Sequence, residues 1–494
     1  MGRPRGDGAP DADHRRAPED GGRSGGASRG RGAPVSFARQ SLFTFLTRLA
    51  VSLINLPVSI LIVRTLGASG QGIYSAAATL TTLWAIFGLL GIDAAHTYLL
   101  AGRRAPLGRI LAHSLILTAG LSLVLVPSFL VLAPAAVGAT AADFGRYAGL
   151  AAMAIPLIVA RYMLLSVFLG RKRIGTFNIL NAVSALSLLA LIAGLVVTAG
   201  SGPGGAVLAF VLSTAVFVAA AVFWLARISR EGESLRMELS WETLRFSFIY
   251  GLKGHLVTVL SQFNYRFDMI LVLRWLGTAA QGYYSVAVLL AEKLSHITAS
   301  VQLVLFPWVS GSRREEADRL TPWACRHTLF WVAAAGAVLF FAGPFLIDLL
   351  YTDDFQRALP AFRVLIPGII ALTLSKLLSS DLSGRNRRGL PTIAMAAAFA
   401  VNLGLNFILI PRHGILGAAW ASTIAYSLQT AIMIVFFTRV SGVPAWELVR
   451  WRGEDLQLYR RWMKKARDRV GGRRDDDDVE RILPGPPVDP EGPA

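Results

Sequence analysis

Long apolar stretches separated by short polar segments make up most of this chain. Twelve stretches are about 20 residues long, the length that a helix needs to cross a hydrocarbon layer of about 30 Å. They cover residues 41–63, 75–95, 110–133, 146–169, 174–198, 206–226, 246–273, 285–309, 325–350, 362–382, 390–410 and 416–438. The pattern predicts an all-α polytopic membrane protein with twelve transmembrane helices.

One segment occurs twice. Residues 61–80 (LIVRTLGASGQGIYSAAATL) and 271–290 (LVLRWLGTAAQGYYSVAVLL) share ten of twenty positions at an offset of 210, without a gap. The shared positions include arginine, glutamine, glycine and tyrosine, which apolar composition alone does not supply. A fixed-period repeat indicates an internal duplication, so we expect two homologous six-helix lobes with a pathway along their interface.

The duplication predicts the domain organisation. We expect the two lobes to be joined by a short cytoplasmic linker and flanked by basic tails, of which the first is disordered. The expected parts are the N-terminal tail at 1–35, the N-lobe with helices 1–6 at 36–230, the linker at 231–245, the C-lobe with helices 7–12 at 246–438 and the C-terminal tail at 439–494. Within the last tail, residues 446–470 are either an amphipathic helix on the inner leaflet or a solvated segment.

Charge adds an orientation to this picture. Charged residues make up only 16% of the chain and apolar residues 54%, which excludes a soluble protein of this length. The net charge of +18 is concentrated in alternate loops and in the tails, where it favours contact with anionic lipid rather than nucleic acid. By the positive-inside rule, the arginine-rich loops and both termini are predicted to be cytoplasmic. The single Cys325 excludes an internal disulfide and a cysteine-based metal site.

Polar side chains follow one face of helix 1 and of its repeat counterpart, helix 7. In helix 1 the stripe includes Ser52 and Asn55 among residues spaced three or four apart. Such stripes line a hydrated cavity or hold neighbouring helices together, and the sequence leaves both alternatives open.

Ionisable residues inside apolar segments are more informative, because each costs at least about 2.5–3.5 kcal/mol at the centre of a membrane helix. The candidate cations for a substrate site are Arg48, Arg161, Lys253, Arg266 and Lys293. Their excess over acidic groups favours an anionic ligand such as phosphate or pyrophosphate. The alternative is a structural ion pair, either Arg266 with Asp268 or Arg161 with Glu292.

Three further groups are candidates for coupling Na+ or H+ to transport, namely Asp268, Glu292 and His296. Glu292 and His296 share a helix face at i, i+4 spacing, although a packing role for His296 is an alternative. We recognise no catalytic triad, phosphate-binding loop or metal-ligand cluster. The expectation is therefore a transporter without a bound cofactor, and not an enzyme.

The LG-x3-QG-x-YS motif at 66–75, its repeat at 276–285, the FDMILVLRWLG segment at 267–277 and the GRNRRG turn at 384–389 resemble the polysaccharide biosynthesis (Wzx-type oligosaccharide flippase) family. This family belongs to the multidrug/oligosaccharidyl-lipid/polysaccharide exporter superfamily, and the resemblance covers residues 36–438. The family fold it implies is MATE-like. The site residue it implies is Asp268, which matches a common acidic position in the seventh helix.

The function that the resemblance implies is flipping of an undecaprenyl-pyrophosphate-linked oligosaccharide from the inner to the outer leaflet of the bacterial cytoplasmic membrane by alternating access. The glycan would serve cell-surface polysaccharide, such as O-antigen or exopolysaccharide. The basic tails are candidates for docking a polysaccharide polymerase or a glycosyltransferase.

Three alternatives remain at this point. An ion-coupled multidrug exporter of the same superfamily is disfavoured because helix 1 lacks an acidic cluster. A lipid II flippase is disfavoured because those relatives usually carry fourteen helices. A non-transporting scaffold for envelope-polymer synthesis would have the polar faces of helices 1 and 7 closed by packing.

Overall fold

The computed structural model describes residues 33–138, 142–230, 236–451, 453 and 455, and the regular elements in this part of the chain are helices. The α-helices of the first half are α1 (Ala33–Leu89), α2 (Ile92–Ala101), α3 (Leu107–Val137), α4 (Ala142–Ala152), α5 (Ala154–Gly170), α6 (Ile174–Leu191) and α7 (Gly202–Arg230), with the π-helix η2 (Ile192–Thr198). Those of the second half are α8 (Trp241–Glu292), α9 (Ser295–Gly311), α10 (Arg314–Leu350), α11 (Leu359–Gly384) and α12 (Gly389–Ser441), with the 3-10 helices η3 (Asp353–Ala358) and η4 (Ala445–Leu448).

Within the described residues, eight helices are long and apolar enough to cross a membrane, or nine if α4 and α5, bent by 49°, form one span. Three of them, α1, α8 and α12, are 57, 52 and 53 residues long, and each contains one glycine with non-helical backbone angles. These glycines are Gly67, Gly277 and Gly414, and all three have positive φ. The predicted count of twelve spans would require each of these three helices to be divided at its glycine, whereas the described residues give eight or nine spans.

The segments expected between helices 1 and 2 and between helices 7 and 8 are not open loops. The chain is helical on both sides of Gly67 and of Gly277, and each glycine alone makes the turn. The polar residues of the repeated motif suggested a loop, but they are buried between the lobes. Conversely, predicted helices 2, 4 and 8 each contain a break, at Gly91, Met153 and Leu294 respectively.

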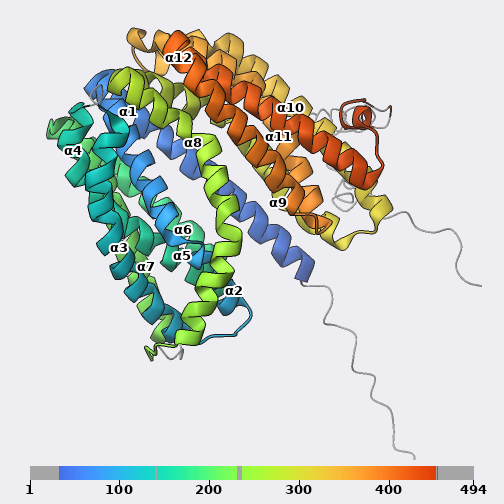
Figure 1. Ribbon diagram of the computed structural model, residues 1–494, viewed down its shortest axis with the longest axis horizontal. Helices are drawn as coiled ribbons and strands as arrows, with labels where there is room; N and C mark the ends of the chain where they lie inside the picture. Colours follow the sequence, from blue (N-terminus) through green and yellow to red (C-terminus); the bar gives the residue numbers. More distant parts are fainter. Residues whose placement is uncertain (1–32, 139–141, 231–235, 452, 454, 456–494) are drawn as a thin grey trace, which may run out of the picture.

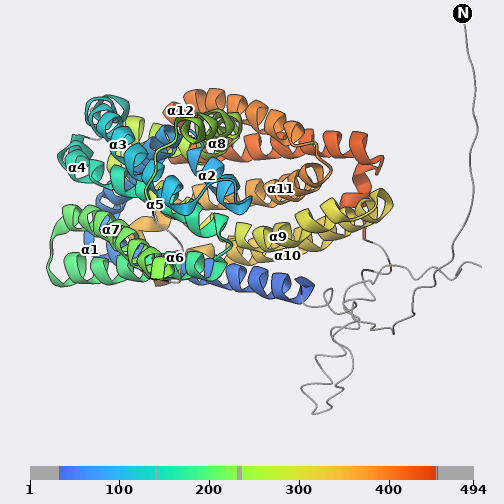
Figure 2. The same ribbon diagram turned by 90° about the horizontal axis from the view of Figure 1, so that it is seen from below.

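Two helical bundles meet at one end and diverge from there (Figure 1). Helices α2 to α7 make up the first bundle and α9 to α12 the second, with the long helices α1 and α8 between them; Figure 2 gives the perpendicular view. Each long helix also packs into the other half, because Val63 of α1 belongs to the core of the second bundle and Leu273 of α8 to that of the first. The predicted two-lobe helical architecture is confirmed.

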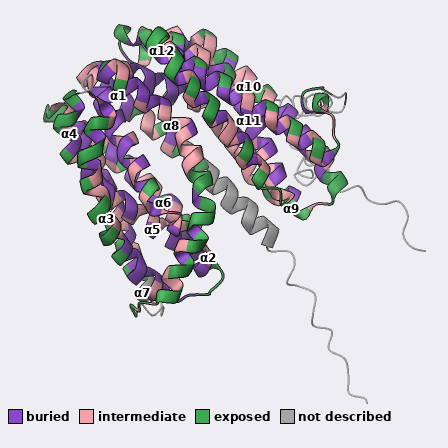
Figure 3. Ribbon diagram, in the orientation of Figure 1, coloured by how far each residue is buried: buried purple, intermediate pink, exposed green. Residues whose placement is uncertain are grey.

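Large apolar side chains are exposed on the outer faces of the bundles, where Figure 3 shows exposed residues along α3, α4 and α12. Leu123 of α3 and Phe341 of α10 are each 78% exposed. In water such surfaces would associate, whereas lipid solvates them. The exposed apolar faces and the helix lengths together make this a multi-pass membrane protein.

The arginine-bearing loops α2–α3, α5–α6, α9–α10 and α11–α12 mark one end of the molecule, the arginine-rich end. The broken turn at Gly67 and the carboxyl ends of α3 and α10 mark the opposite end. Here Arg64 donates from Nη2 to the Leu349 carbonyl at 2.5 Å, and its repeat counterpart Arg274 donates from Nη1 to the Ala135 carbonyl at 2.6 Å. Each arginine therefore caps the last helix turn of a helix in the other half.

The repeated motif forms the contact between the lobes at the opposite end. Gln71 Nε2 donates to Ser285 Oγ at 3.2 Å, and Gln281 Nε2 donates to Ser75 Oγ at 3.3 Å. Gln71 corresponds to Gln281 and Ser75 to Ser285 in the repeat, so the two bonds are related by a pseudo-twofold axis. We call these four residues the reciprocal contact.

The glycine after each glutamine lets the backbones approach at this contact. A Cβ at Gly72 would lie 1.8 Å from the Thr278 carbonyl oxygen, and a Cβ at Gly282 would lie 2.0 Å from the Ala68 carbonyl oxygen. Any side chain there would push the lobes apart. The motif is therefore explained by packing across the duplication.

Parts of the predicted tails and linker lie outside the described residues, namely 1–32, 231–235 and 456–494. Helix α1 begins at Ala33, α8 begins at Trp241 and α12 continues to Ser441, so all three helices extend beyond the predicted lobe boundaries. The expected amphipathic helix at 446–470 begins within the short 3-10 helix η4, and most of it is outside the described part.

Candidate functional site

A cavity of about 400 Å³ lies between the lobes and receives side chains from both. Its polar lining from α1, α5, α6 and α8 includes Asn55, Ser59, Arg161, Asn181, Ser184, Gln262, Arg266 and Glu292, and α7 adds Ser213 and Thr214. Gln71, Ser75 and Ser285 of the reciprocal contact also line it. The polar faces predicted on helices 1 and 7 thus contribute Asn55, Ser59 and Gln262 to a cavity.

Arg161 is the cation that the first lobe contributes. Its Nη2 donates to Asn181 Oδ1 at 2.9 Å, and its Nη1 donates to Ser184 Oγ at 3.3 Å. The guanidinium also lies over the ring of Phe217, 4.4 Å from the centroid. Its partners in the described part of the chain are neutral, so its positive charge is oriented but not neutralised.

Arg266 is the cation of the second lobe, and it is paired. Its Nη1 and Nη2 donate to the two carboxylate oxygens of Glu292 at 2.9 and 3.1 Å. The side chains are 33% and 38% exposed, so the pair is accessible from the cavity. The sequence suggested Arg266 with Asp268 or Arg161 with Glu292; both suggestions are wrong, because the turn between the two arms of α8 at Gly277 brings Glu292 back beside Arg266.

A hydrogen-bonded group links α1 to the break between α8 and α9. Lys293 Nζ donates to the backbone carbonyl of Ser52 at 2.9 Å and to its Oγ at 2.7 Å. Ser52 Oγ is also 2.7 Å from His296 Nε2. Neither Ser52 nor Lys293 is among the residues that line the two cavities described here, so both hold helices together in this conformation.

A second cavity of about 200 Å³ lies inside the second lobe. Its polar lining includes Asp268, Glu292, His296 and Lys376. Glu292 borders both cavities and so stands in the wall between them.

Asp268 is 4% exposed. It accepts hydrogen bonds from the hydroxyl of Tyr284, from Ser422 Oγ at 3.0 Å and from the backbone N–H of Met269 at 2.8 Å. All three donors are neutral. Asp268 is thus a buried carboxyl group with no ion-pair partner among these contacts.

Two predicted site residues do not appear in this arrangement. Lys253 is exposed and lines neither cavity. The side chain of Arg48 lies outside the described residues.

Several lining residues escaped the sequence reasoning. Asn181 and Ser184 are three apart in a predicted helix, so a search for polar stripes beyond helices 1 and 7 would have found them. In the second cavity Tyr426 was also missed; it lines that cavity with Tyr265 and Lys376, whose Nζ is 5.6 Å from the ring centroid of Tyr265. Among the described residues no group of three or more His, Cys, Asp and Glu side chains is placed to hold a metal ion.

Comparison with protein families places this geometry in context. The model of a family described as polysaccharide biosynthesis protein matches residues 60–360, which is more than half of the chain.

Three curated relatives are similar in sequence. A probable low-salt glycan biosynthesis flippase of Haloferax volcanii is 24% identical over 378 residues, covering 75% of this chain and 76% of the relative. A putative O-antigen transporter of Shigella flexneri is 20% identical over 297 residues, covering 60% and 70%. An uncharacterized membrane protein of Methanocaldococcus jannaschii is 26% identical over 167 residues, and the match spans only 33% of each chain.

Among solved structures, an inward-facing multidrug resistance MATE transporter of the MOP superfamily superimposes with a TM-score of 0.68 at 16% identity. The match covers 81% of this chain and 98% of the transporter. At this identity the likeness shows a MATE-like fold and says nothing of cargo.

Proposed function

This chain belongs to the polysaccharide biosynthesis protein family, and on that premise we propose that it is a flippase that moves an undecaprenyl-pyrophosphate-linked oligosaccharide across the membrane. The direction is from the leaflet at the arginine-rich end to the other leaflet. The proposed location is the bacterial cytoplasmic membrane, with that end and both termini in the cytoplasm. The similarity to the Haloferax glycan biosynthesis flippase and to the Shigella O-antigen transporter supports this proposal.

The observation that carries the proposal is the charge of the cavity between the lobes. Its lining contains Arg161, held by neutral partners, and Arg266, neutralised by Glu292. The cavity thus offers one uncompensated guanidinium, with a second that an anion can reach. A phosphate-bearing headgroup would accept paired hydrogen bonds from such planar forks, which bind oxyanions better than an ammonium group does.

The arrangement suits alternating access. The reciprocal contact closes the lobes at the opposite end and borders the cavity, while the bundles diverge from there. A headgroup entering from the arginine-rich end would meet the cavity cations while its lipid chain stayed in the bilayer. Rocking of one lobe against the other would then expose it on the other side, and no covalent bond changes.

We further propose that Asp268 couples a proton or Na+ to the cycle. Its carboxyl group is buried in the second lobe and bound by neutral donors from α8 and α12. Binding of H+ or Na+ there would alter the packing between these helices. The basic tails would contact anionic lipid, and docking of a polymerase or glycosyltransferase on them is part of the same proposal.

The alternatives fit the structure less well. A scaffold would have its polar faces closed by packing, whereas Asn55 and Gln262 line a cavity. A drug-cation exporter would need excess negative charge in the cavity between the lobes, whereas the charged lining there is two arginines and one glutamate.

Flipping assays in proteoliposomes test the proposal. The wild type should translocate a fluorescent undecaprenyl-pyrophosphate oligosaccharide, and Arg161→Ala should lose at least about tenfold in rate, because one charge-assisted contact contributes about 1.5–3 kcal/mol. Lys253→Ala, an exposed cation outside both cavities, is the matched control and should behave as the wild type. Translocation of a drug cation instead, or of no cargo at matched reconstitution, would overturn the flippase reading.

A further inference from the structure

We propose that Glu292 determines how much negative charge a ligand needs in order to bind Arg266. Singly charged anions do not displace the Glu292 carboxylate from Arg266, whereas a headgroup with two or more negative charges does. The inference rests on the proposed function, because it concerns how the same cavity selects its cargo. Glu292 would thereby act as a specificity-determining residue.

The ion pair has the geometry of an occupied anion site. Both terminal nitrogens of Arg266 are taken by the two oxygens of one carboxylate, at 2.9 and 3.1 Å. A phosphate would use the same two nitrogens in the same plane. Ligand and Glu292 are therefore direct competitors for Arg266.

The competition has different outcomes for different charges. A phosphodiester carries one negative charge, so exchanging it for Glu292 replaces one anion by another and leaves a partly buried carboxylate without its partner. A diphosphate carries at least two charges, and the same cavity holds a second cation, Arg161. Only the second exchange gains an attraction that the resting cavity lacks.

A displaced Glu292 side chain can move towards the second cavity. It lines both cavities, and the second contains Lys376 and His296. Lys376 Nζ has a neutral contact, Ser295 Oγ at 3.3 Å. A displaced Glu292 carboxylate would therefore face a cation across the second cavity, which lowers the cost of releasing Arg266 to a dianion.

This device addresses a problem that any lipid-headgroup site faces. A membrane presents a large excess of singly charged phosphodiester lipids, and two open arginines would bind them. With Glu292 in place, the net charge of Arg161, Arg266 and Glu292 is that of one cation. The carboxylate therefore raises the negative charge that a ligand needs in order to bind, and it does so by competition rather than by the shape of the cavity.

Two soluble probes with one prenyl chain test the inference: farnesyl diphosphate and the singly charged methyl ester of farnesyl phosphate. The purified wild type should bind the diphosphate at least about tenfold more tightly. Because the diphosphate already displaces Glu292 in the wild type, Glu292→Gln should tighten binding of the methyl ester by about tenfold more than binding of the diphosphate, so that the ratio falls towards one. An unchanged ratio in Glu292→Gln would overturn the proposal.

Two further variants keep the outcome interpretable. The double variant Arg266→Gln, Glu292→Gln removes the pair without leaving either charge unpaired; it should bind both probes weakly and also lose discrimination. If it kept the wild-type ratio, Glu292 and Arg266 would play no part in selection. If Arg161→Ala bound both probes with the same affinity as the wild type, the proposal that the cavity takes an anionic cargo would itself fail. That outcome is distinct from an unchanged ratio in Glu292→Gln.

The reciprocal contact carries an independent inference. We infer that it is the gate at the opposite end, and that the duplicated sequence motif is retained because both halves of one gate must fit each other. Its two hydrogen bonds are neutral and 3.2–3.3 Å long. The Oε1 atoms of Gln71 and Gln281 are buried without a partner in the described part of the chain.

These features describe a contact built to separate. Opening would expose both orphaned oxygens to water and so recover the hydration that closure removes. Closure in turn requires the backbone approach at Gly72 and Gly282. The open state is therefore favoured by hydration of the two glutamine oxygens and the closed state by close backbone packing, and no ion pair among the four residues of the reciprocal contact holds it closed.

A crosslink tests the gate. Ser69 Oγ and Thr278 Oγ1 are 2.9 Å apart beside the contact, and the one native cysteine, Cys325, is buried. Ser69→Cys with Thr278→Cys should form a disulfide on oxidation, stop flipping and recover on reduction, while each single variant stays active. Failure to crosslink, or unchanged flipping with the disulfide formed, would overturn the inference.

Discussion

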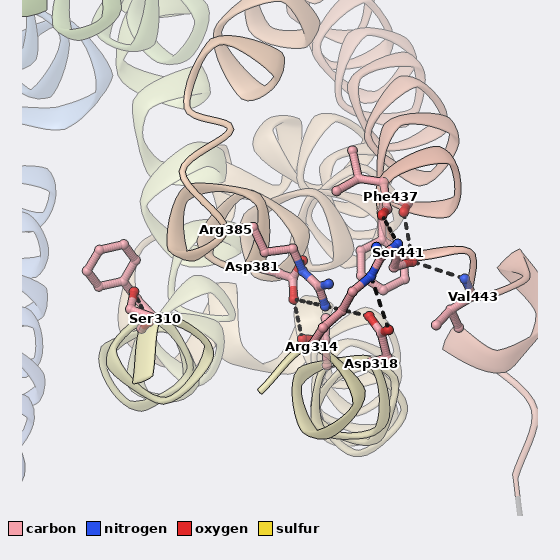
Figure 4. A network of polar contacts seen from close by, with 11 residues as sticks. Ser310, Arg314, Asp318, Asp381, Arg385, Phe437, Ser441 and Val443 are labelled. Atoms are coloured by element: carbon pink, nitrogen blue, oxygen red, sulfur yellow. Dashed lines mark hydrogen bonds and ion pairs between the residues drawn. The ribbon is translucent and has the colours of Figure 1, made fainter. Parts of the chain in front are cut away.

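Arg385 forms an ion pair with Asp381, which lies one turn earlier, on α11; Arg385 Nε is 2.7 Å from Asp381 Oδ2 (Figure 4). Asp381 has no exposed surface, and it also accepts from Thr321 of α10 at 2.7 Å. Arg385 reaches Asp318 of α10 at 2.8 Å, so one guanidinium joins the amino end of α10 to the carboxyl end of α11. The first arginine of the GRNRRG turn is therefore a structural clamp in addition to a topology signal.

Breaking this clamp should destabilise the second lobe. Asp381→Ala leaves the guanidinium of Arg385 with one carboxylate in a buried site, and we expect a loss of about 3 kcal/mol in unfolding free energy. The thermal unfolding midpoint of the detergent-solubilised protein measures it. Arg387→Ala, at an exposed position of the same turn, is the control and should change little. Equal effects of the two substitutions would contradict the clamp.

The geometry of Arg161 predicts that lysine cannot replace it. Arg161→Lys keeps the charge but loses the two-point hold on Asn181 and Ser184 and the planar face over Phe217. Binding of farnesyl diphosphate should weaken by about tenfold with little change in thermal stability. Isothermal titration with Arg161→Lys and Lys253→Arg in parallel checks this, and wild-type affinity in Arg161→Lys would show that charge alone suffices.

The beginning of the C-terminal tail is fastened to α10 by a buried ion pair. Arg326 donates from Nε and Nη2 to the Asp455 carboxylate at 2.9 and 3.2 Å, and the two side chains are 5% and 3% exposed. Asp455→Ala should lower the unfolding free energy by about 3 kcal/mol and make the segment after Ser441 more sensitive to protease. Limited proteolysis tests this; a digestion pattern identical to that of the wild type would count against the anchor.

Arg64 and Arg274, which cap carbonyl groups across the lobes, should compensate for each other, so that the loss of one has a smaller effect than the loss of both. Arg64 caps α10 and Arg274 caps α3 through equivalent positions of the repeat. Because both are exposed, each single alanine variant should cost about 1 kcal/mol or less. The double variant should favour opening at this end, measured as faster alkylation of Thr278→Cys. No gain in alkylation would remove the arginines from the gate.

Much of the fold was predictable because hydrophobic length and self-similarity are local properties of the chain. Nine of the twelve apolar segments are unbroken helix and the other three contain one short break each, and the repeat at 61–80 and 271–290 correctly indicated two related lobes. The repeat did not indicate that the chain stays helical around Gly67. Polar residues that are buried against the equivalent residues of the other lobe cannot be told from loop residues in a sequence.

The site was predictable only as a set of residue types. Charged residues in apolar segments had to find partners, so Arg161, Arg266, Asp268 and Glu292 could be singled out from their cost alone. Which partner each found depended on helices that fold back: Glu292 lies 26 positions after Arg266, and His296 lies 244 positions after Ser52. Lys253 met the same criterion and remains exposed.

The sequence by itself determined that this protein spans a membrane with helices, that it is duplicated and that its apolar segments carry excess positive charge. These properties follow from the chain's own hydrophobicity and need no knowledge of neighbours. The tertiary structure alone decided that Arg266 is neutralised by Glu292 while Arg161 is not, and that the repeated glutamines meet across the lobes. Pairing depends on distances of a few ångströms between helices far apart in sequence, and only packing sets those distances.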